Sequence, residues 1–250
     1  MFDTILNHRS IRKYKSDPIP EAITNYILEA GTRASTTGNM QLYSIVLTES
    51  EEGKEALSPC HFNQGMVKQA PLVLTFCADF NRFNLWCRQR KAEPGYDNFL
   101  SFMTAAIDAL LVAQNVAIAA EDAGLGICYL GTTTYMADKI IDVLGLPTGV
   151  VPVTTLTVGY PDEHPEHTDR LPLEAVLHKE RYKDYSPSHI DEIYREKESM
   201  ESYQEFVKEN GKETLAQVFT DVRYKKADNL HFSRVLLDVL DHQGFMLHQE

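Results

Sequence analysis

A short basic stretch near the N-terminus, HRSIRKY beginning at His8, is the first candidate for chemistry in this sequence. Arg9 and Arg12 stand three positions apart, so in a turn or a helical segment their side chains can converge on one anion. A planar guanidinium group suits phosphate better than an ammonium group does, and Ser10 can add a third hydrogen bond. The pattern indicates an anion site. The alternative interpretation is a solvated basic turn.

Two further stretches bear polar groups beside apolar segments. The first is the loop ASTTGNMQ from Ala34 to Gln41, whose hydroxyls, amides and flexible glycine can hydrogen-bond a heterocycle or a ribityl chain. Loops between a helix and a strand are often polar for other reasons, so this interpretation stays open. The second is Gly131 with the three threonines that follow it, a turn of the kind that brings backbone close to a ligand.

The common catalytic and nucleotide-binding motifs are missing from the sequence. Gly124 and Gly126 follow a predicted helix instead of a strand, and Lys212 is followed by Glu213, so neither a dinucleotide fingerprint nor a P-loop is present. No HExxH or GxSxG occurs. His164 and His167 form an HxxH pair without a third ligand, which is weak support for zinc. We therefore predict no catalytic side chain and no metal, and expect the chemistry to belong to a bound organic cofactor.

The element that must position these groups is a long apolar helix. From Phe99 to Ala123 apolar residues or alanine fall on nearly every face, which predicts a helix buried all round in a core or an interface. Asp108 and other polar residues interrupt it, and its longest charge-free run is too short for a transmembrane span. Gly124 ends the helix, and a short apolar strand then leads to Gly131.

Hydrophobic patterns predict the remaining elements. Strands are expected at residues 42–47, 72–78, 127–130 and 151–160, and the second of these reads as a central strand because its apolar run is almost unbroken. Helices are expected after Pro20, over residues 81–90 and over 136–144, and a short one carrying Asn63, Gln64 and Val67. The charged C-terminal part predicts helices at 190–208, 215–219 and 230–240. Strands separated by helices indicate an α/β or α+β fold.

Composition excludes several classes of function. The 250 residues suit one sizeable domain or two small ones, and the net charge of -12 repels nucleic acid and anionic membranes, so we predict neither as a partner. The four cysteines show no CxxC spacing and read as free thiols. The first residues lack the features of a signal peptide. Together these observations predict a cytoplasmic protein.

Four motifs in order resemble the nitroreductase family of FMN-dependent NAD(P)H oxidoreductases. They are the stretch HRSIR from His8, Gln64 and Val67 before the Ala70-Pro71 strand, the alanine-rich helix leading to Tyr129-Leu130-Gly131, and Gly159-Tyr160-Pro161 followed by Arg170-Leu171-Pro172. The segment from Tyr194 to Phe245 is similar to the C-terminal extension of the branch that contains major oxygen-insensitive nitroreductases and NADPH-flavin reductases.

This resemblance implies an α+β fold with a central, mostly antiparallel sheet flanked by helices. It also implies an intertwined homodimer with FMN at the subunit interface and NADPH or NADH as reductant. Residues 1–185 would form the FMN-binding core, and residues 186–250 a helical extension that wraps the core or the partner subunit. The implied reaction passes hydride by a ping-pong mechanism through FMN to small aromatic acceptors, namely nitroaromatic, quinone, azo or flavin compounds.

The resemblance also assigns cofactor-binding residues by matching motif positions. Phosphate and ribityl contacts fall on His8, Arg9, Ser10 and Arg12, with Arg170 joining on the phosphate. Contacts with the flavin ring fall on Thr36, Gly38, Asn39, Gln64, Tyr129, Leu130, Gly131 and Thr132.

Two departures from the family pattern bear on function. Where this branch has Lys-x-Arg, the chain has Thr168-Asp169-Arg170, so a cation is replaced and an acid enters, which is expected to weaken FMN binding unless another residue compensates. The turn at Gly131 has threonines in place of a Gly-Gly-x-Arg pattern. The first departure, at Thr168 and Asp169, keeps a second hypothesis open, a flavin-binding sensor or carrier with little turnover. Dehalogenating and flavin-fragmenting relatives are a third, which the C-terminal segment disfavours.

Overall fold

The structure, a computed structural model, describes residues 2–247 and divides the chain into two compact units. The first unit comprises residues up to Glu166 together with those from Phe232 onward, and the second runs from His167 to His231. The assignment of residues 1–185 to a core and 186–250 to an extension stays a prediction.

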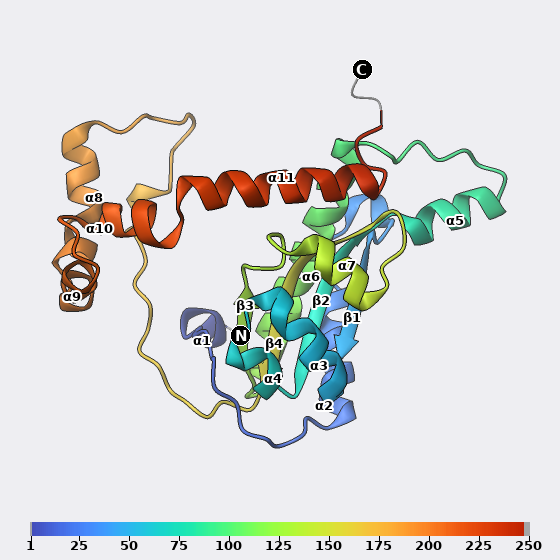
Figure 1. Cartoon of the computed structure of the whole chain (residues 1–250), viewed down its shortest axis with the longest axis horizontal. Helices are drawn as coiled ribbons and strands as arrows, with labels where there is room; N and C mark the ends of the chain where they lie inside the picture. Colours follow the sequence, from blue (N-terminus) through green and yellow to red (C-terminus); the bar gives the residue numbers. More distant parts are fainter. Residues whose placement is uncertain (1, 248–250) are drawn as a thin grey trace. The chain divides into compact units, whose positions relative to one another are not determined.

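A four-stranded antiparallel sheet is the centre of the first unit (Figure 1). Its strands β1 (Tyr43–Thr48), β2 (Leu72–Asp79), β3 (Gly126–Leu130) and β4 (Val150–Gly159) lie in the order β1-β2-β4-β3. All eight residues of β2 are buried, which confirms it as a central strand. The four strands fall within about a residue of their predicted bounds, and the α+β architecture is confirmed.

The long helix α6 (Phe99–Asp122) covers one face of the sheet together with α2 (Glu21–Thr32). The side chain of Asn98 caps its start by accepting a hydrogen bond from the Ser101 N–H, and the chain turns away at Gly124, whose φ is +81°. A Cβ on Gly31 of α2 would lie 2.4 Å from a methyl group of Val116, so glycine is what lets the two helices approach this closely. The predicted helix is confirmed.

The opposite face of the sheet is covered by α3 (Glu51–Leu57), the 3₁₀ segment η2 (Ser58–His61), α4 (Gly65–Gln69) and α7 (Ala137–Leu144). The prediction that Asn63 and Gln64 lie within a helix was wrong. Phe62 and Asn63 adopt left-handed backbone conformations, which end η2, and Gln64 stands just before the first residue of α4.

Three shorter helical segments complete the first unit: α1 (Phe2–Leu6), η1 (Thr37–Asn39) and α5 (Asn81–Gln89). The C-terminal helix α11 (Lys226–His242) contributes Val239 and Leu240 to a cluster around Phe80 and Phe102, with Phe245 beside them. The end of the chain is therefore built into the core that the middle of the chain forms.

The second unit consists of short helices: η3 (Leu173–Ala175), α8 (Pro187–Ser199), α9 (Glu201–Glu209), α10 (Leu215–Val218) and η4 (Phe219–Arg223). The prediction of one continuous helix over 190–208 was wrong, because Met200 has an extended ψ of 131° and separates α8 from α9. The hydroxyl of Ser199 donates to the Glu196 carbonyl at 2.7 Å, a local bond that competes with the continuing helix.

Helix α6 is the one helix among residues 2–247 with the length and hydropathy of a membrane span, and 56% of that window is buried inside the fold. Its buried side packs on α2 and the sheet, in agreement with the predicted core helix. Its other side carries exposed apolar residues.

Candidate functional site

The basic N-terminal stretch lies along the edge strand β3. Ser10 forms a parallel bridge with Ile127, and the Ile11 N–H donates to the Ile127 carbonyl at 2.8 Å. A Cβ on Gly126 would lie 2.7 Å from the Ile11 side chain, so glycine at that position is what allows the stretch to pack against the strand. The fold therefore holds the predicted anion-binding residues beside the strand that leads to the Gly131 turn.

Arg9 carries a polar atom that the rest of the protein does not satisfy. One terminal nitrogen donates weakly to the Asn7 carbonyl at 3.3 Å, while its Nε is buried and has no hydrogen-bond partner. A buried donor of a charged group left unpaired costs roughly 1 to 3 kcal/mol. An anionic ligand would remove that cost, so this guanidinium fits a phosphate group.

A cavity of about 200 Å³ adjoins Arg9, and two acidic side chains, Glu121 and Glu163, line it. Both carboxylates already have partners. His8 Nδ1 lies 2.7 Å from Glu121 Oε1, and Glu163 Oε1 accepts hydrogen bonds from the backbone N–H groups of Arg12 and Lys13. These bonds satisfy carboxylate oxygens next to Arg9, and the Arg12 side chain is exposed to solvent.

Three of the five predicted groups of site residues meet around one hydrophobic cluster. Ile11 of the basic stretch, Val67 of the segment that carries Gln64, and Cys128 and Leu130 of β3 pack together. His8, Arg9, Ser10, Arg12, Gln64, Tyr129, Leu130, Gly131 and Thr132 thus belong to neighbouring segments on one side of the first unit. Tyr129 alternates with Cys128 and Leu130 and packs toward the opposite face, against the cluster under α6.

The turn after β3 is fixed by its threonines. The Thr133 hydroxyl donates to the Leu130 carbonyl at 2.9 Å, and its oxygen lies 3.0 Å from the Thr155 hydroxyl oxygen. Gly131 does not have a left-handed φ, and a Cβ there would have no atom within 4 Å. The fold therefore does not need glycine at 131, whereas a planar ligand lying against the backbone would.

The loop with Thr36, Gly38 and Asn39 is held by the buried carboxylate of Asp108 on α6, which is 1% exposed. One carboxylate oxygen accepts from the N–H and the hydroxyl of Thr37 at 2.9 and 3.2 Å, and the other accepts from the Leu42 N–H at 3.2 Å. The sequence marks Asp108 only as an interruption of an apolar helix. The structure makes it the anchor of both ends of this loop.

The same loop does not join the other predicted residues within one chain. It precedes β1 and the Gly131 turn follows β3, and these are the two edge strands of the sheet. The start of β1 and the end of β3 point toward the same end of the sheet, but β2 and β4 lie between these two strands. At about 4.8 Å between neighbouring strands, β1 and β3 are roughly 14 Å apart.

Arg170 belongs to the second unit, where its guanidinium donates to the carbonyls of Thr168 and Asp169 at 3.1 and 2.9 Å. The Asp169 carboxylate is paired with Lys197 Nζ at 2.8 Å and accepts from the Tyr203 hydroxyl at 2.6 Å. Burial raises the pKa of Asp169, but the hydrogen bonds from Lys197 and Tyr203 outweigh it and the pKa lies below its ordinary value. Asp169, the acid that stands next to the missing cation, is thus ion-paired within the second unit.

Sequence reasoning missed His61. Its side chain is fully buried, and its Nδ1 lies 2.8 Å from the hydroxyl of Thr132 in the Gly131 turn. Burial lowers the pKa of His61 to about 4, so the imidazole is neutral at pH 7. His61 is a single histidine between Pro59 and a polar turn, and this local sequence does not predict its contact with Thr132.

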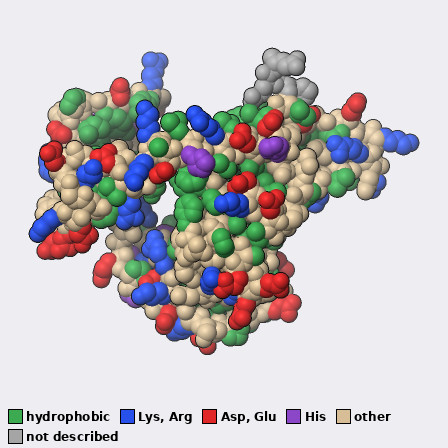
Figure 2. Space-filling view, viewed as in Figure 1, with side chains coloured by type: hydrophobic (Ala, Val, Ile, Leu, Met, Phe, Trp, Pro, Cys, Tyr) green, Lys and Arg blue, Asp and Glu red, His purple; other side chains and the backbone are tan. Residues whose placement is uncertain are grey.

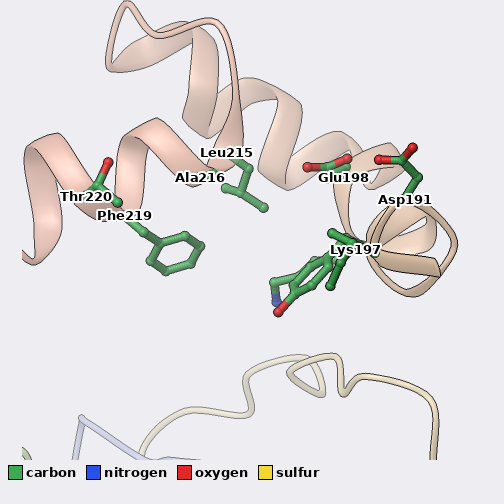
Figure 3. Close-up of a pocket in the computed structure, with 9 residues that line it drawn as sticks. Asp191, Lys197, Glu198, Leu215, Ala216, Phe219 and Thr220 are labelled. Atoms are coloured by element: carbon green, nitrogen blue, oxygen red, sulfur yellow. The ribbon is translucent and has the colours of Figure 1, made fainter. Parts of the chain in front are cut away.

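A separate cavity of about 360 Å³ lies in the second unit between α8, α10 and η4 (Figure 3). Leu215 and Phe219 line one side, and Asp191, Lys197 and Glu198 the other. It contains none of the predicted cofactor-binding residues.

Among residues 2–247 no group of three or more His, Cys, Asp or Glu side chains is arranged to hold a metal ion. Acidic and basic side chains alternate over the face seen in Figure 2, without a continuous basic surface.

Comparisons with known proteins identify the family of this chain. The family model described as the nitroreductase family matches residues 5–160. The chain is 37% identical over 182 residues to an FMN reductase (NADPH) of Bacillus subtilis, covering 72% of this chain and 73% of the relative.

Solved structures are similar over nearly the whole length. A Bacteroides fragilis protein superposes with a TM-score of 0.96 at 57% identity, over 98% of this chain and 99% of the other. The NfrA1 nitroreductase of Bacillus subtilis superposes with a TM-score of 0.87 at 31% identity, over 98% of each chain.

The buried His61 predicts how stability depends on pH. The pKa is about 4 in the folded protein and about 6.5 in an unfolded chain, so the unfolded state binds the extra proton first. The free energy of unfolding therefore has its full value above pH 6.5. It falls by about 3 kcal/mol as the pH drops from 6.5 to 4. Urea denaturation at pH 7, 5.5 and 4 measures it. The His61→Leu variant is the control, because it should lose less stability than the wild type over this interval; parallel curves would contradict the assignment.

Proposed function

From the premise that the chain belongs to the nitroreductase family and is an FMN-dependent NAD(P)H oxidoreductase, we propose that it passes hydride from NADPH or NADH to nitroaromatic, quinone or flavin acceptors by a ping-pong mechanism. The observation that carries the proposal is the buried, unpartnered Nε of Arg9 on the same strand edge as the open turn at Gly131. An anion site and a flat backbone surface on one edge suit a cofactor with a phosphate at one end and a planar ring at the other. When bound, FMN supplies the two-electron chemistry.

The basic stretch holds the phosphate end in this proposal. Arg9 donates from its buried edge, and Arg12 and Ser10 reach the same anion from the adjacent backbone. His8, bonded to Glu121 through Nδ1, has its Nε2 available for a ribityl or phosphate oxygen. The family resemblance assigns Arg170 to the phosphate as well, and that assignment stays a prediction.

The ring end rests on the backbone of Tyr129, Leu130, Gly131 and Thr132, with the Gln64 side chain at its edge. Fixed backbone N–H groups stabilise negative charge that develops on a bound ring without having to reorganise. None of these side chains needs to donate or accept a proton in the transfer, so we assign no catalytic acid or base. The nicotinamide and the acceptor would bind one after the other beside the ring. The proposed specificity is therefore for flat aromatic compounds.

A homodimer accounts for the outer face of α6. Exposed apolar residues recur there at helical spacing: Leu100, Met103, Ile107, Leu110 and Leu111 are 40 to 75% exposed. A continuous apolar stripe of this kind marks an interaction surface. In a dimer formed through α6, the loop that Asp108 holds on that helix would extend Thr36, Gly38 and Asn39 toward the ring bound by the partner subunit, which explains why they lie far from the other site residues in one chain.

The cytoplasm is the proposed compartment. The four cysteines are free and buried, as suits a reducing environment, and a nicotinamide-dependent reductase needs NADPH or NADH at hand. The B. subtilis relative is named for NADPH, which favours NADPH as reductant.

The hypothesis of a sensor or carrier with little turnover rests on Thr168 and Asp169. The Asp169 carboxylate is ion-paired with Lys197 and accepts a hydrogen bond from Tyr203, which weakens the part of the hypothesis that rests on the acid. A paired carboxylate repels a phosphate group much less than a free one does.

The direct test is anaerobic reduction. We expect the purified protein to be yellow with bound FMN, and its visible absorbance to bleach on mixing with NADPH or NADH and to return on addition of a quinone or nitroaromatic compound. Rapid-mixing spectroscopy measures both half-reactions separately, as a ping-pong mechanism requires. Bound FMN that neither nucleotide bleaches would show that the proposed reaction is wrong.

Arg9→Ala tests the anion site. Removing a charge-assisted hydrogen bond to phosphate should cost roughly 1.5 to 3 kcal/mol of FMN binding, about a tenfold to hundredfold loss of affinity. Fluorescence titration of apoprotein with FMN measures it. Arg88→Ala, which removes an exposed arginine from α5, is the matched control and should bind FMN like the wild type. Equal affinities for both variants would place the phosphate elsewhere.

Leu110→Asp tests the dimer. A charge in the middle of the apolar stripe should convert the dimer into a monomer, because burying an unpaired carboxylate costs several kcal/mol. Analytical ultracentrifugation measures the mass. Val143→Asp on α7 is the control, since Val143 is 39% exposed but lies outside the stripe. A wild type that sediments as a monomer would overturn the proposal.

A further inference from the structure

A hydrogen bond inside the protein joins the two segments that flank the proposed flavin ring. His61 ends η2, three residues before Gln64, and its Nδ1 lies 2.8 Å from the hydroxyl of Thr132 in the turn after β3. Both residues are buried, His61 completely and Thr132 at 7% exposure. The contact therefore spans 71 positions of sequence and fixes the separation of the Gln64 segment from the Gly131 turn.

The imidazole is a costly way to fill this space. Its second nitrogen, Nε2, is buried without a partner, and the hydroxyl of Ser58 in the same 3₁₀ segment is likewise buried and unpartnered. An unsatisfied buried nitrogen destabilises a fold, and an apolar side chain of similar size would avoid that cost. Packing alone therefore does not account for histidine at this position, whereas its bond to Thr132 does.

The same two segments are held together from outside by an aromatic contact. The ring of Phe232 on α11 stacks on Tyr135 with centroids 4.5 Å apart, and it also contacts Phe62, with centroids 6.1 Å apart. Phe62 directly follows His61, and Tyr135 stands three residues after Thr132. Apolar contacts hold the segments close but tolerate sliding, so the directional bond from His61 is what sets their register.

We propose that His61 is a positioning residue of the flavin site: by holding the Thr132 hydroxyl it keeps the backbone of the Gly131 turn at the distance from Gln64 that the flavin ring requires. This inference rests on the proposed function. The neutral imidazole makes the bond in either tautomer, because a hydroxyl both donates and accepts. It also brings no positive charge to the site.

Variants at the two ends of the bond test the proposal. His61→Leu removes it, and His61→Asn keeps a polar atom near the place of Nδ1. Thr132→Val removes the hydroxyl, and Thr132→Ser keeps it. Ser58→Ala is the matched control, because it removes a buried hydroxyl from the same segment without touching the bond. The readouts are the FMN dissociation constant from fluorescence titration of apoprotein, the visible spectrum of bound FMN, and thermal unfolding of the apoprotein.

We expect His61→Leu and Thr132→Val each to weaken FMN binding about tenfold and to shift the visible bands, and the double variant to lose little more than either single one. His61→Asn and Thr132→Ser should recover most of the affinity, and Ser58→Ala should bind like the wild type. If His61→Leu does not fold, the Thr132→Val and Thr132→Ser pair decides the question by itself.

Two negative results have different meanings. If the wild type binds FMN and the His61 and Thr132 variants bind it equally well, with only their thermal stability lowered, the bond is purely structural and this inference is overturned while the proposed function stands. If the wild type itself binds no FMN, the proposed function fails, and the inference fails with it.

Discussion

The attachment of the N-terminal stretch to β3 is the constraint on which the rest of the site depends. The hydrogen bond from Ile11 to Ile127 places the basic cluster on the strand that ends at the Gly131 turn, and Gly126 provides the room for this contact. At about 3.3 Å per residue, Ile127 and Gly131 are roughly 13 Å apart along the strand. The strand itself therefore sets the separation between the proposed phosphate site and the proposed ring site, and no flexible loop lies between them.

The flanking loops are held by buried polar groups that the core would otherwise not contain. Asp108 satisfies three donors from the loop before β1, and His61 binds the hydroxyl of Thr132. Each of these side chains loses its hydration on burial, and hydrogen bonds inside the protein compensate for that loss. Because these bonds require a defined geometry, they also fix the position of the partner. Apolar packing on both faces of the sheet provides the stability, while these few polar contacts determine where the loops lie.

The sequence was sufficient for the parts of the fold that follow from periodicity. The unbroken apolar run of β2 and the apolar faces of α6 predict buried elements, and Gly124 predicts the end of the helix. Contacts between distant segments were not predictable, because nothing local to His61 indicates Thr132. The break at Met200 was missed because α8 and α9 are both amphipathic and no glycine or proline separates them. Residue types alone indicated the basic stretch, the loop with Thr36 and the turn at Gly131, whereas the family resemblance assigned the remaining site residues. Only the sheet order shows that the Thr36 loop lies at the other edge.

An anion at the proposed phosphate site is affected mainly by the charged groups close to it. The net charge is -12, and the two acids that line the cavity next to Arg9 each have hydrogen-bond partners. Glu121 is bonded to His8, and Glu163 is bonded to backbone N–H groups. Coulomb interactions between exposed charges are screened over about 8 Å at physiological ionic strength, so distant acids on the surface matter little to a bound anion. What an anion at this site meets is therefore the sum over its near neighbours and not the net charge of the chain.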